Sequence, residues 1–357
     1  MIKERILSWV GVERVHNLAI WWLRILVRIP FAKGVMRSMY RVDHPSLERE
    51  VLGLHFANPI GMAAGFDRSG EVLTGLESVG FGFVEVGSIT PEPQVGNPKP
   101  RLFRLAKDRA IINRMGHPSR GWVYAINKLR RRSSSVVVGC NIARNNNTPH
   151  SGAGRELLKS FRNLYQYVDY FTVNISYKHL FNEIEVTPQE ALTEVLTPLF
   201  DFRRGQSDYR PIMLKVVADL GDDILDAVSD VLISTPLDGI VAVSGTNLRE
   251  GLSSSSEQLE KIGRGRLSGA PIRERALEVV RHIHRRTDGA YPIIGVGGIS
   301  TADDAQAMID AGASLVQIYS SFIYGGLSTV GKMCQGLIVE EKQEADMQGG
   351  EFTDTSI

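Results

Sequence analysis

The chain has 357 residues, of which 43 % are hydrophobic and 23 % charged, and its formal net charge is +1. These values are typical of a soluble globular enzyme with one large domain or two small ones, and so small a net charge argues against a general nucleic-acid-binding protein. The two cysteines, Cys140 and Cys334, are far apart and form no C-x-x-C pattern or Cys/His cluster, so the sequence indicates neither a disulfide framework nor a metal site.

The N-terminal 45 residues differ from the rest in charge and hydropathy. They carry eight Lys/Arg against three Asp/Glu, and the stretch LAIWWLRILVRI at 18–29 is apolar except for Arg24 and Arg28. It is shorter than the roughly 20 apolar residues of a membrane-spanning helix and lacks a signal-peptide cleavage site. The helical spacing of Leu18 and Trp22 leaves two interpretations open: packing on the main domain, or a basic amphipathic segment lying in a membrane surface.

From residue 58 onward, short apolar runs alternate with segments of helical apolar spacing. The eight runs that we expect to form strands are 58–64, 81–88, 136–142, 169–175, 211–216, 238–243, 292–297 and 314–319. Val/Ile-rich strands separated by helices indicate a parallel sheet buried on both faces, and eight such units predict an α/β fold of the (β/α)₈ TIM-barrel class. An open doubly wound sheet is the alternative, but no G-x-G-x-x-G follows the first strand.

The same pattern divides the chain into three segments. Residues 1–45 are predicted to be helical, residues 46–338 to form the barrel, and residues 339–357 to be an acidic, apolar-poor, disordered tail. Two connections within the barrel, 89–118 and 176–190, are long enough to be lids over a site.

In such a barrel, the active site is built from the C-terminal ends of the strands and the loops that follow them. This rule alone selects Ala63, Ala64, Gly65, Ser88, Asn141, Asn174, Lys215, Ser244, Thr246, Gly298, Tyr319 and Ser320. It also draws attention to the loop after the fourth strand, where Tyr177, Lys178 and His179 are consecutive residues that can do acid or base chemistry.

Two of these strand ends carry specific chemical signals. The glycine-rich turn in IIGVGGIS, followed by SLVQIYSSF, is typical of a phosphate cradle after the seventh and eighth strands, although Gly297 and Gly298 could simply make a tight turn. Lys215 would point into the barrel mouth, where a cation needs a negative partner. The anionic N1/O2 edge of a reduced flavin is one such partner, and an ordinary carboxylate is the other.

Five motifs, in order, carry a resemblance to a known family: GMAAGFDRSG, GFGFVEVGSITPEPQVGNPKPRLFRL, INRMG, PIIGVGGIS and GASLVQIYS. They resemble those of the class 2, membrane-associated dihydroorotate dehydrogenases, and the similarity runs from about residue 10 to about residue 335. The resemblance implies an FMN-containing barrel that passes electrons to a quinone, with N-terminal helices through which the quinone reaches the flavin. It also implies a peripheral location on the cytoplasmic face of the cell membrane.

The resemblance assigns most of the site residues to the flavin and the quinone. Its FMN contacts correspond to Ala63, Ala64, Gly65, Arg68, Ser88, Asn141, Asn174, Lys215, Gly269, Gly298, Tyr319 and Ser320. Arg68, like Arg144, stands where the family usually has lysine, which preserves the charge. The quinone contacts correspond to His16, Arg104 and Tyr319.

The substrate side departs from the family pattern. After the fourth strand the family has N-x-S-S-P-N, whose second serine is the base, whereas this chain has N-I-S-Y-K-H. Asn113 and Asn174 keep two of the four asparagines that hold the substrate, while His179 and Ser244 replace the other two. His117 stands in place of a phenylalanine.

These departures suggest a changed organic substrate. The expected function is an FMN-dependent, quinone-linked dehydrogenase that desaturates or oxidises a small molecule next to a carbonyl, as in a specialised biosynthetic pathway. Its candidate catalytic residues are Tyr177, Lys178, His179 and His117, and its candidate substrate contacts are Asn113, Asn174, Ser244 and Thr246. Two alternatives stay open: a genuine quinone-dependent dihydroorotate dehydrogenase of pyrimidine biosynthesis, and a catalytically silent flavoprotein.

Overall fold

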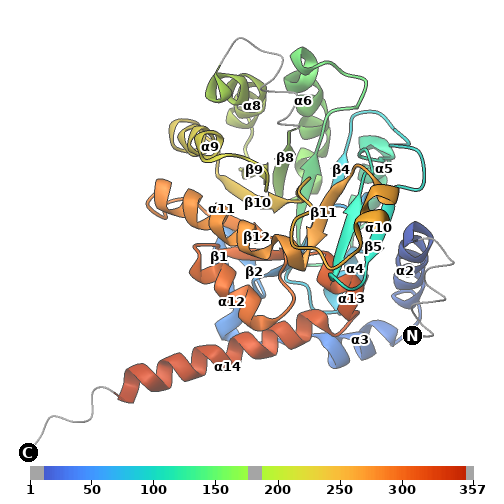
Figure 1. Ribbon diagram of the computed structural model, residues 1–357, viewed down its shortest axis with the longest axis vertical. Helices are drawn as coiled ribbons and strands as arrows, with labels where there is room; N and C mark the ends of the chain where they lie inside the picture. The colour runs from blue at the N-terminus through green and yellow to red at the C-terminus, as the bar shows by residue number, and fades with distance from the viewer. Residues whose placement is uncertain (1–11, 176–186, 351–357) are drawn as a thin grey trace, which may run out of the picture.

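The computed structural model describes residues 12–175 and 187–350 (Figure 1). Its centre is a closed barrel of parallel strands in the order β10-β12-β13-β3-β4-β7-β8-β9, which confirms the predicted fold. The barrel strands are β3 (Ile60–Met62), β4 (Phe83–Ile89), β7 (Val137–Ile142), β8 (Tyr170–Asn174), β9 (Ile212–Val217), β10 (Gly239–Ser244), β12 (Ile293–Val296) and β13 (Leu315–Ile318). Each lies within or beside one of the eight predicted runs.

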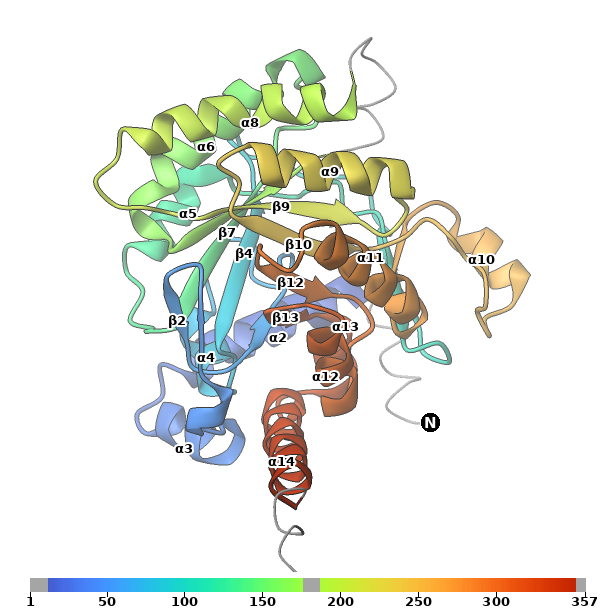
Figure 2. The ribbon, with the colours of Figure 1, turned by 90° about the vertical axis from the view of Figure 1, so that its left-hand side faces the viewer.

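Helices surround the barrel, as both ribbon views show (Figures 1 and 2). The helices that follow β3 along the chain are α4 (Leu73–Ser78), α5 (Gly121–Leu129), α6 (Ala153–Leu164), α8 (Pro188–Arg204), α9 (Asp222–Ser234), α10 (Ser256–Ile262), α11 (Arg273–Arg286), α12 (Ala302–Asp310), α13 (Ser320–Gly325) and α14 (Thr329–Gly350), with 3₁₀ turns at Pro45–Leu47, His150–Gly152, Tyr165–Tyr167 and Ala270–Ile272. Local sequence sets some of the boundaries. Helix α8, for example, begins with a capping box between Thr187 and Glu190 and with Pro188 in its first turn.

Aromatic side chains fill the end of the barrel opposite the site. Phe56, Phe83 and Tyr170 are fully buried in one cluster, and strand glycines make the space for two of them. A Cβ atom on Gly61 would lie 2.3 Å from the Phe83 ring. The antiparallel hairpin of β1 (Arg49–Val51) and β2 (Leu54–Phe56) contributes Phe56 to this cluster. The filled end leaves the C-terminal strand ends as the place for a ligand.

The connection 89–118, which the sequence presents as a simple lid, instead contains a hairpin of β5 (Leu102–Leu105) and β6 (Ala110–Asn113). Strand β6 also pairs with β11 (Arg266–Gly269), which follows β10 in the chain, and the three strands form a small antiparallel sheet. The sequence analysis missed this sheet because the pairing joins segments about 150 residues apart, and such a pairing leaves no local pattern.

Two N-terminal helices, α2 (Val12–Leu26) and α3 (Ala32–Tyr40), precede the barrel. Helix α2 is joined to the β5 segment by Glu13, which accepts hydrogen bonds from Arg101 at 2.6 and 3.2 Å. Burial raises the pKa of Glu13, but the Arg101 hydrogen bond and charge outweigh it and leave the pKa below its usual value. Leu23 is the buried apolar contact of this helix, whereas Leu18 and Trp22 are each about half exposed. Packing on the main domain therefore does not account for the positions of Leu18 and Trp22.

Within the described ranges, none of the helices is both long and apolar enough to span a bilayer. At the other end of the chain, α14 continues to Gly350, so the backbone of 339–350 is helical where the sequence analysis expected disorder. This segment is rich in Glu, Lys, Gln, Ala and Met, which are strong helix formers, and acidic composition alone was a poor guide. Both ribbon views show α14 projecting away from the barrel.

The contact between Glu13 and Arg101 yields a prediction about the docking of α2. Hydrogen bonds to charged groups contribute about 1.5–3 kcal/mol, so Glu13→Ala should raise hydrogen–deuterium exchange in α2 roughly 10- to 100-fold while the barrel strands keep their protection. Arg24→Ala, on the same helix, removes a longer ion pair of 3.5 Å to Glu71 and should have a smaller effect. Equal exchange in the two variants would contradict this assignment.

Candidate active site

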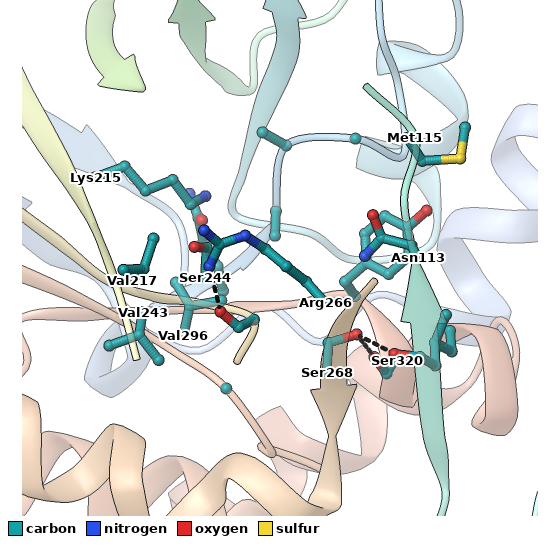
Figure 3. Close-up of a pocket in the computed structure, with 18 of the residues that line it drawn as sticks. Asn113, Met115, Lys215, Val217, Val243, Ser244, Arg266, Ser268, Val296 and Ser320 are labelled. Carbon is teal, nitrogen blue, oxygen red and sulfur yellow. Dashed lines mark hydrogen bonds between the residues drawn. The ribbon is translucent and has the colours of Figure 1, made fainter. Parts of the chain in front are cut away.

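A cavity of about 470 Å³ opens at the C-terminal ends of the barrel strands, as the barrel rule predicts. Its volume is within the range of pockets that hold a cofactor or small ligand. Its wall includes the predicted residues Ala63, Ala64, Gly65, Arg68, Ser88, Asn113, His117, Asn141, Asn174, Lys215, Ser244, Gly269, Gly298, Tyr319 and Ser320. Figure 3 shows part of this wall.

Four of the predicted substrate and catalytic residues are not seen in the wall. Tyr177, Lys178 and His179 lie outside the described residues, so their roles stay predictions. Thr246 is described, but it does not line the cavity: its hydroxyl donates to Asp219, and its backbone pairs with Leu267 in an isolated bridge. Thr246 therefore holds the loop after β10, and its assignment as a substrate contact stays a prediction.

A buried carboxylate lies in the barrel interior beneath the cavity. Glu85 on β4 is fully buried and is 3.4 Å from the ammonium of Lys215. Its oxygens also accept hydrogen bonds from Asn141 (3.0 Å), Thr172 (3.0 Å) and Gln317 (2.9 Å). Of the two negative partners considered for Lys215, the structure shows the carboxylate directly. Because Lys215 also lines the cavity, its charge still faces any ligand that binds there.

Three polar side chains form a hydrogen-bonded row along the ends of β4, β7 and β8. Ser88 donates to the Asn141 side-chain oxygen at 2.6 Å, and the Asn174 amide lies 3.3 Å from Ser88 and 3.4 Å from Asn141. Gly87 permits this close approach: its φ is 116°, and a Cβ atom there would lie 2.3 Å from the Asn141 carbonyl. The row is thus held in place before any ligand binds.

A second part of the cavity wall, formed around Gly298 and Ser320, suits a phosphate. Gly298 has a φ of 75°, and a Cβ atom on it would lie 2.9 Å from the Arg273 backbone nitrogen. The hydroxyls of Ser268 and Ser320 are 3.3 Å apart, as Figure 3 shows. The Ser321 hydroxyl next to them is buried and finds no hydrogen-bond partner in the described part of the chain. A buried donor without a partner is costly, and a phosphate oxygen would satisfy it. The sequence analysis did not identify Ser268 or Ser321.

Aromatic rings connect the cavity with helix α2. The His16 and Phe66 rings meet edge-to-face at 5.0 Å, and the Phe66 and Tyr319 rings are 6.2 Å apart. Burial, and next the charge of Arg68, lower the pKa of His16 to about 4, while burial raises the pKa of Tyr319 despite the charges of Arg68 and Arg104. Both rings are therefore uncharged at neutral pH. The structure brings together His16, Arg104 and Tyr319, which were predicted to contact the quinone.

His117 and Arg266 lie on the remaining side of the cavity. His117 has a left-handed backbone (φ 47°), and its carbonyl accepts a hydrogen bond from the Gln94 side chain at 2.8 Å. Burial, and next the charges of Arg266 and Arg144, lower the pKa of His117, so its imidazole is neutral at pH 7. The sequence analysis missed Arg266, because an arginine in the Gly-rich stretch GRGRLSG looks like part of a solvated loop.

Comparison with known proteins agrees with this arrangement. A model of the dihydroorotate dehydrogenase family matches residues 46–340. The chain is 41 % identical to the Christiangramia forsetii protein named dihydroorotate dehydrogenase (quinone), over 91 % of this chain and 94 % of that one. It is also 41 % identical to the protein of the same name from a Roseiflexus strain, over 92 % and 90 % of the two chains.

A solved structure of DHODH from Eimeria tenella, in complex with ferulenol, superposes with a TM-score of 0.82 at 31 % identity, covering 93 % of this chain and 92 % of that one. The chain belongs to the dihydroorotate dehydrogenase family. The cofactor of this family is FMN. The phosphate cradle around Ser321 and the cation of Lys215 fit the two charged parts of FMN, its phosphate and its reduced ring.

The cradle yields a prediction about FMN binding. In Gly298→Ala, the new methyl group would meet the Arg273 backbone, and the shift it forces should weaken FMN binding at least 10-fold, measured by fluorescence titration of the apoprotein. Gly53→Ala is the matched control: its φ of 70° imposes similar backbone strain, but no heavy atom lies within 4 Å of the added Cβ atom. Equal FMN affinity in the two variants would count against this phosphate site.

Proposed function

We propose that the protein is an FMN-dependent dehydrogenase that oxidises dihydroorotate and passes the electrons to a quinone. The observation that carries the proposal is the continuity of the site. One cavity joins the phosphate cradle, the Lys215 cation and the polar row of Ser88, Asn141 and Asn174, and Tyr319 in its wall continues through Phe66 to His16 on helix α2. Such a site suits a cofactor that exchanges electrons with a polar substrate and with a second, more apolar partner.

The residues divide the chemistry between them. Bound FMN supplies a two-electron acceptor for the hydride that leaves the substrate. Lys215 stabilises negative charge at that acceptor, and the polar row orients the groups around it. The proton comes from the carbon next to the substrate carbonyl and needs a base. His117, neutral at pH 7, is the described residue best suited to accept it, and Tyr177, Lys178 and His179 stay candidates from the sequence.

The comparisons favour one of the alternatives left open by the sequence, namely that the substrate is dihydroorotate itself. The relatives that share about 40 % of the sequence over most of their length are all named dihydroorotate dehydrogenase (quinone). Dihydroorotate is therefore the substrate we propose first. The expectation of a different substrate receives no support from these relatives.

A second candidate keeps the same cofactor and reaction type but changes the substrate. The observation that favours it is the position of Ser244 and His117 in the cavity wall, because both depart from the residues of the family pattern. A site built to hydrogen-bond a flat diamide loses discrimination when an amide side chain is replaced, since polar groups of the substrate are then buried without partners.

Anaerobic stopped-flow spectroscopy distinguishes these two candidates. Dihydroorotate should bleach the bound FMN rapidly and saturably if the first proposal is right. General-base catalysis is worth roughly 10²- to 10⁴-fold in rate, so a missing base or a misplaced ring would slow bleaching by a comparable factor. Slow bleaching that accelerates in the double variant Ser244→Asn/His117→Phe would instead favour the second candidate.

We also propose that helices α2 and α3 place the protein on the membrane surface, on the cytoplasmic face. Leu18, Trp21 and Trp22 on α2, and Val35 and Met39 on α3, are each at least half exposed. Large apolar side chains gathered on neighbouring helices are unusual on a monomeric soluble surface. Basic residues in the same segment would favour anionic lipids, and a quinone dissolved in the bilayer would approach His16 from this side.

Vesicle co-sedimentation tests this location. Each exposed tryptophan should contribute about 1.5 kcal/mol to binding, so Trp21→Glu/Trp22→Glu should weaken association with anionic-lipid vesicles roughly 100-fold while FMN stays bound. Tyr209→Glu is the control, because Tyr209 is similarly exposed, at 59 %, but lies between α8 and β9. Unchanged sedimentation of the double variant would refute the membrane-facing role of α2.

A further inference from the structure

Arg266 enters the cavity from the small antiparallel sheet rather than from a barrel strand. It is the first residue of β11, and the register of β11 with β6 places it directly opposite Asn113. Residues opposite each other in an antiparallel pair lie on the same face, and both side chains line the cavity. Gly265 permits this approach of the two strands, because a Cβ atom there would lie 2.7 Å from Ile112.

The guanidinium of Arg266 lies among the residues assigned to the substrate. Figure 3 shows the side chain reaching from β11 toward Ser244 and Lys215. Its Nη1 donates to the Gly245 carbonyl at 3.0 Å, so one strand end holds the group in place. Among the described residues, this is the one hydrogen bond that the Arg266 guanidinium makes. A guanidinium has five N–H donors, so most of them are not used by this bond.

Among the described residues, the acidic group that pairs with Arg266 is already engaged elsewhere. Asp219 lies 3.9 Å from Nη1, at the limit of an ion pair. Its oxygens accept the Thr246 hydroxyl and both the backbone and side-chain nitrogens of Asn247. The other carboxylate near the cavity, Glu85, is paired with Lys215 in the barrel interior.

The Arg266 guanidinium therefore makes no hydrogen bond to a carboxylate of the described residues. Burial, and next the charges of Arg266 and Arg144, lower the pKa of His117, so Arg266 lies near that imidazole. Burial also lowers the pKa of Arg266, although an arginine stays charged at any pH at which the protein is folded. A partly desolvated guanidinium with N–H groups to spare is a preferred partner for a carboxylate, which it can bind through two parallel hydrogen bonds.

We propose that Arg266 binds an acidic group of the substrate and makes the enzyme selective for anionic substrates. The inference rests on the proposed function, under which this group is the carboxylate of dihydroorotate. Arg266 would thus add a charged contact, from β11, to the amide contact of Asn113 directly across the sheet. The phosphate of FMN is assigned elsewhere, to the cradle of Ser268, Ser320 and Ser321.

Isothermal titration calorimetry of the FMN-loaded protein tests the proposal with two ligands of nearly equal shape, orotate and its carboxamide. The unmodified protein should bind orotate at least 10-fold more tightly than the carboxamide. Arg266→Gln should weaken orotate binding about 30-fold and leave carboxamide binding unchanged, because only orotate has a negative charge that can pair with Arg266. Arg266→Lys should bind orotate more weakly than the unmodified protein and more tightly than Arg266→Gln, since a lysine keeps the charge but cannot form the bidentate pair.

Controls separate this result from other causes. Arg264→Gln, two residues earlier at an exposed position, should bind orotate like the unmodified protein. Loss of FMN from Arg266→Gln would show that the guanidinium serves the cofactor phosphate and would overturn the proposal. An equal loss for the acid and the amide, or no loss for either, would overturn it too.

If the proposed function is wrong, the titrations of the unmodified protein will give a different result. If the unmodified protein binds neither orotate nor its carboxamide, dihydroorotate is the wrong substrate, and benzoate and benzamide become the test pair. Tighter binding of benzoate that disappears in Arg266→Gln would preserve an anion site with another substrate. Benzoate binding no tighter than benzamide in the unmodified protein would overturn the anion site as well.

Discussion

The buried carboxylate of Glu85 is the constraint on which the site depends. A charge inside a barrel is tolerated only when it is paired and fully hydrogen-bonded. Here Lys215, Asn141, Thr172 and Gln317 all point at it, each from a different strand. Satisfying one carboxylate therefore sets the relative positions of β4, β7, β8, β9 and β13 at the level just beneath the cavity.

That constraint links structure to chemistry. Lys215, Asn141 and Gln317 contact Glu85 and also line the cavity, so the same three side chains support the core and face the ligand. The Lys215 ammonium is held by Glu85 below and lines the cavity above it. In a site pre-organised in this way, the side chains need little rearrangement when charge develops on a bound ring, so the free-energy cost of rearrangement is small.

The site combines residues from two layers, the barrel strands and the added antiparallel sheet. Most residues assigned to the flavin lie at the ends of barrel strands, but Ser268 and Gly269 lie on β11 of the added sheet. Tight glycine positions such as Gly87 and Gly298 leave no room for a larger residue, because a Cβ atom there would meet backbone atoms. Two residues assigned to the substrate, Asn113 and Arg266, lie on the added sheet of β5, β6 and β11, whereas Asn174 and Ser244 lie at the ends of β8 and β10. The added sheet therefore contributes both to the substrate side of the cavity and to the phosphate cradle.

The sequence by itself determined the barrel, because local patterns of apolar spacing mark each strand, and a capping residue marks the start of some helices, such as Thr187 before α8. It also selected part of the cavity wall, including Ser88, Asn141, Lys215 and Tyr319, since the strand-end rule needs only the positions of the strands. Tertiary structure alone decided that Lys215 meets Glu85, that Thr246 turns away from the cavity, and that Arg266 lies opposite Asn113. These contacts join residues far apart in the chain. Their energies depend on burial and on partners from other strands, which no local pattern records.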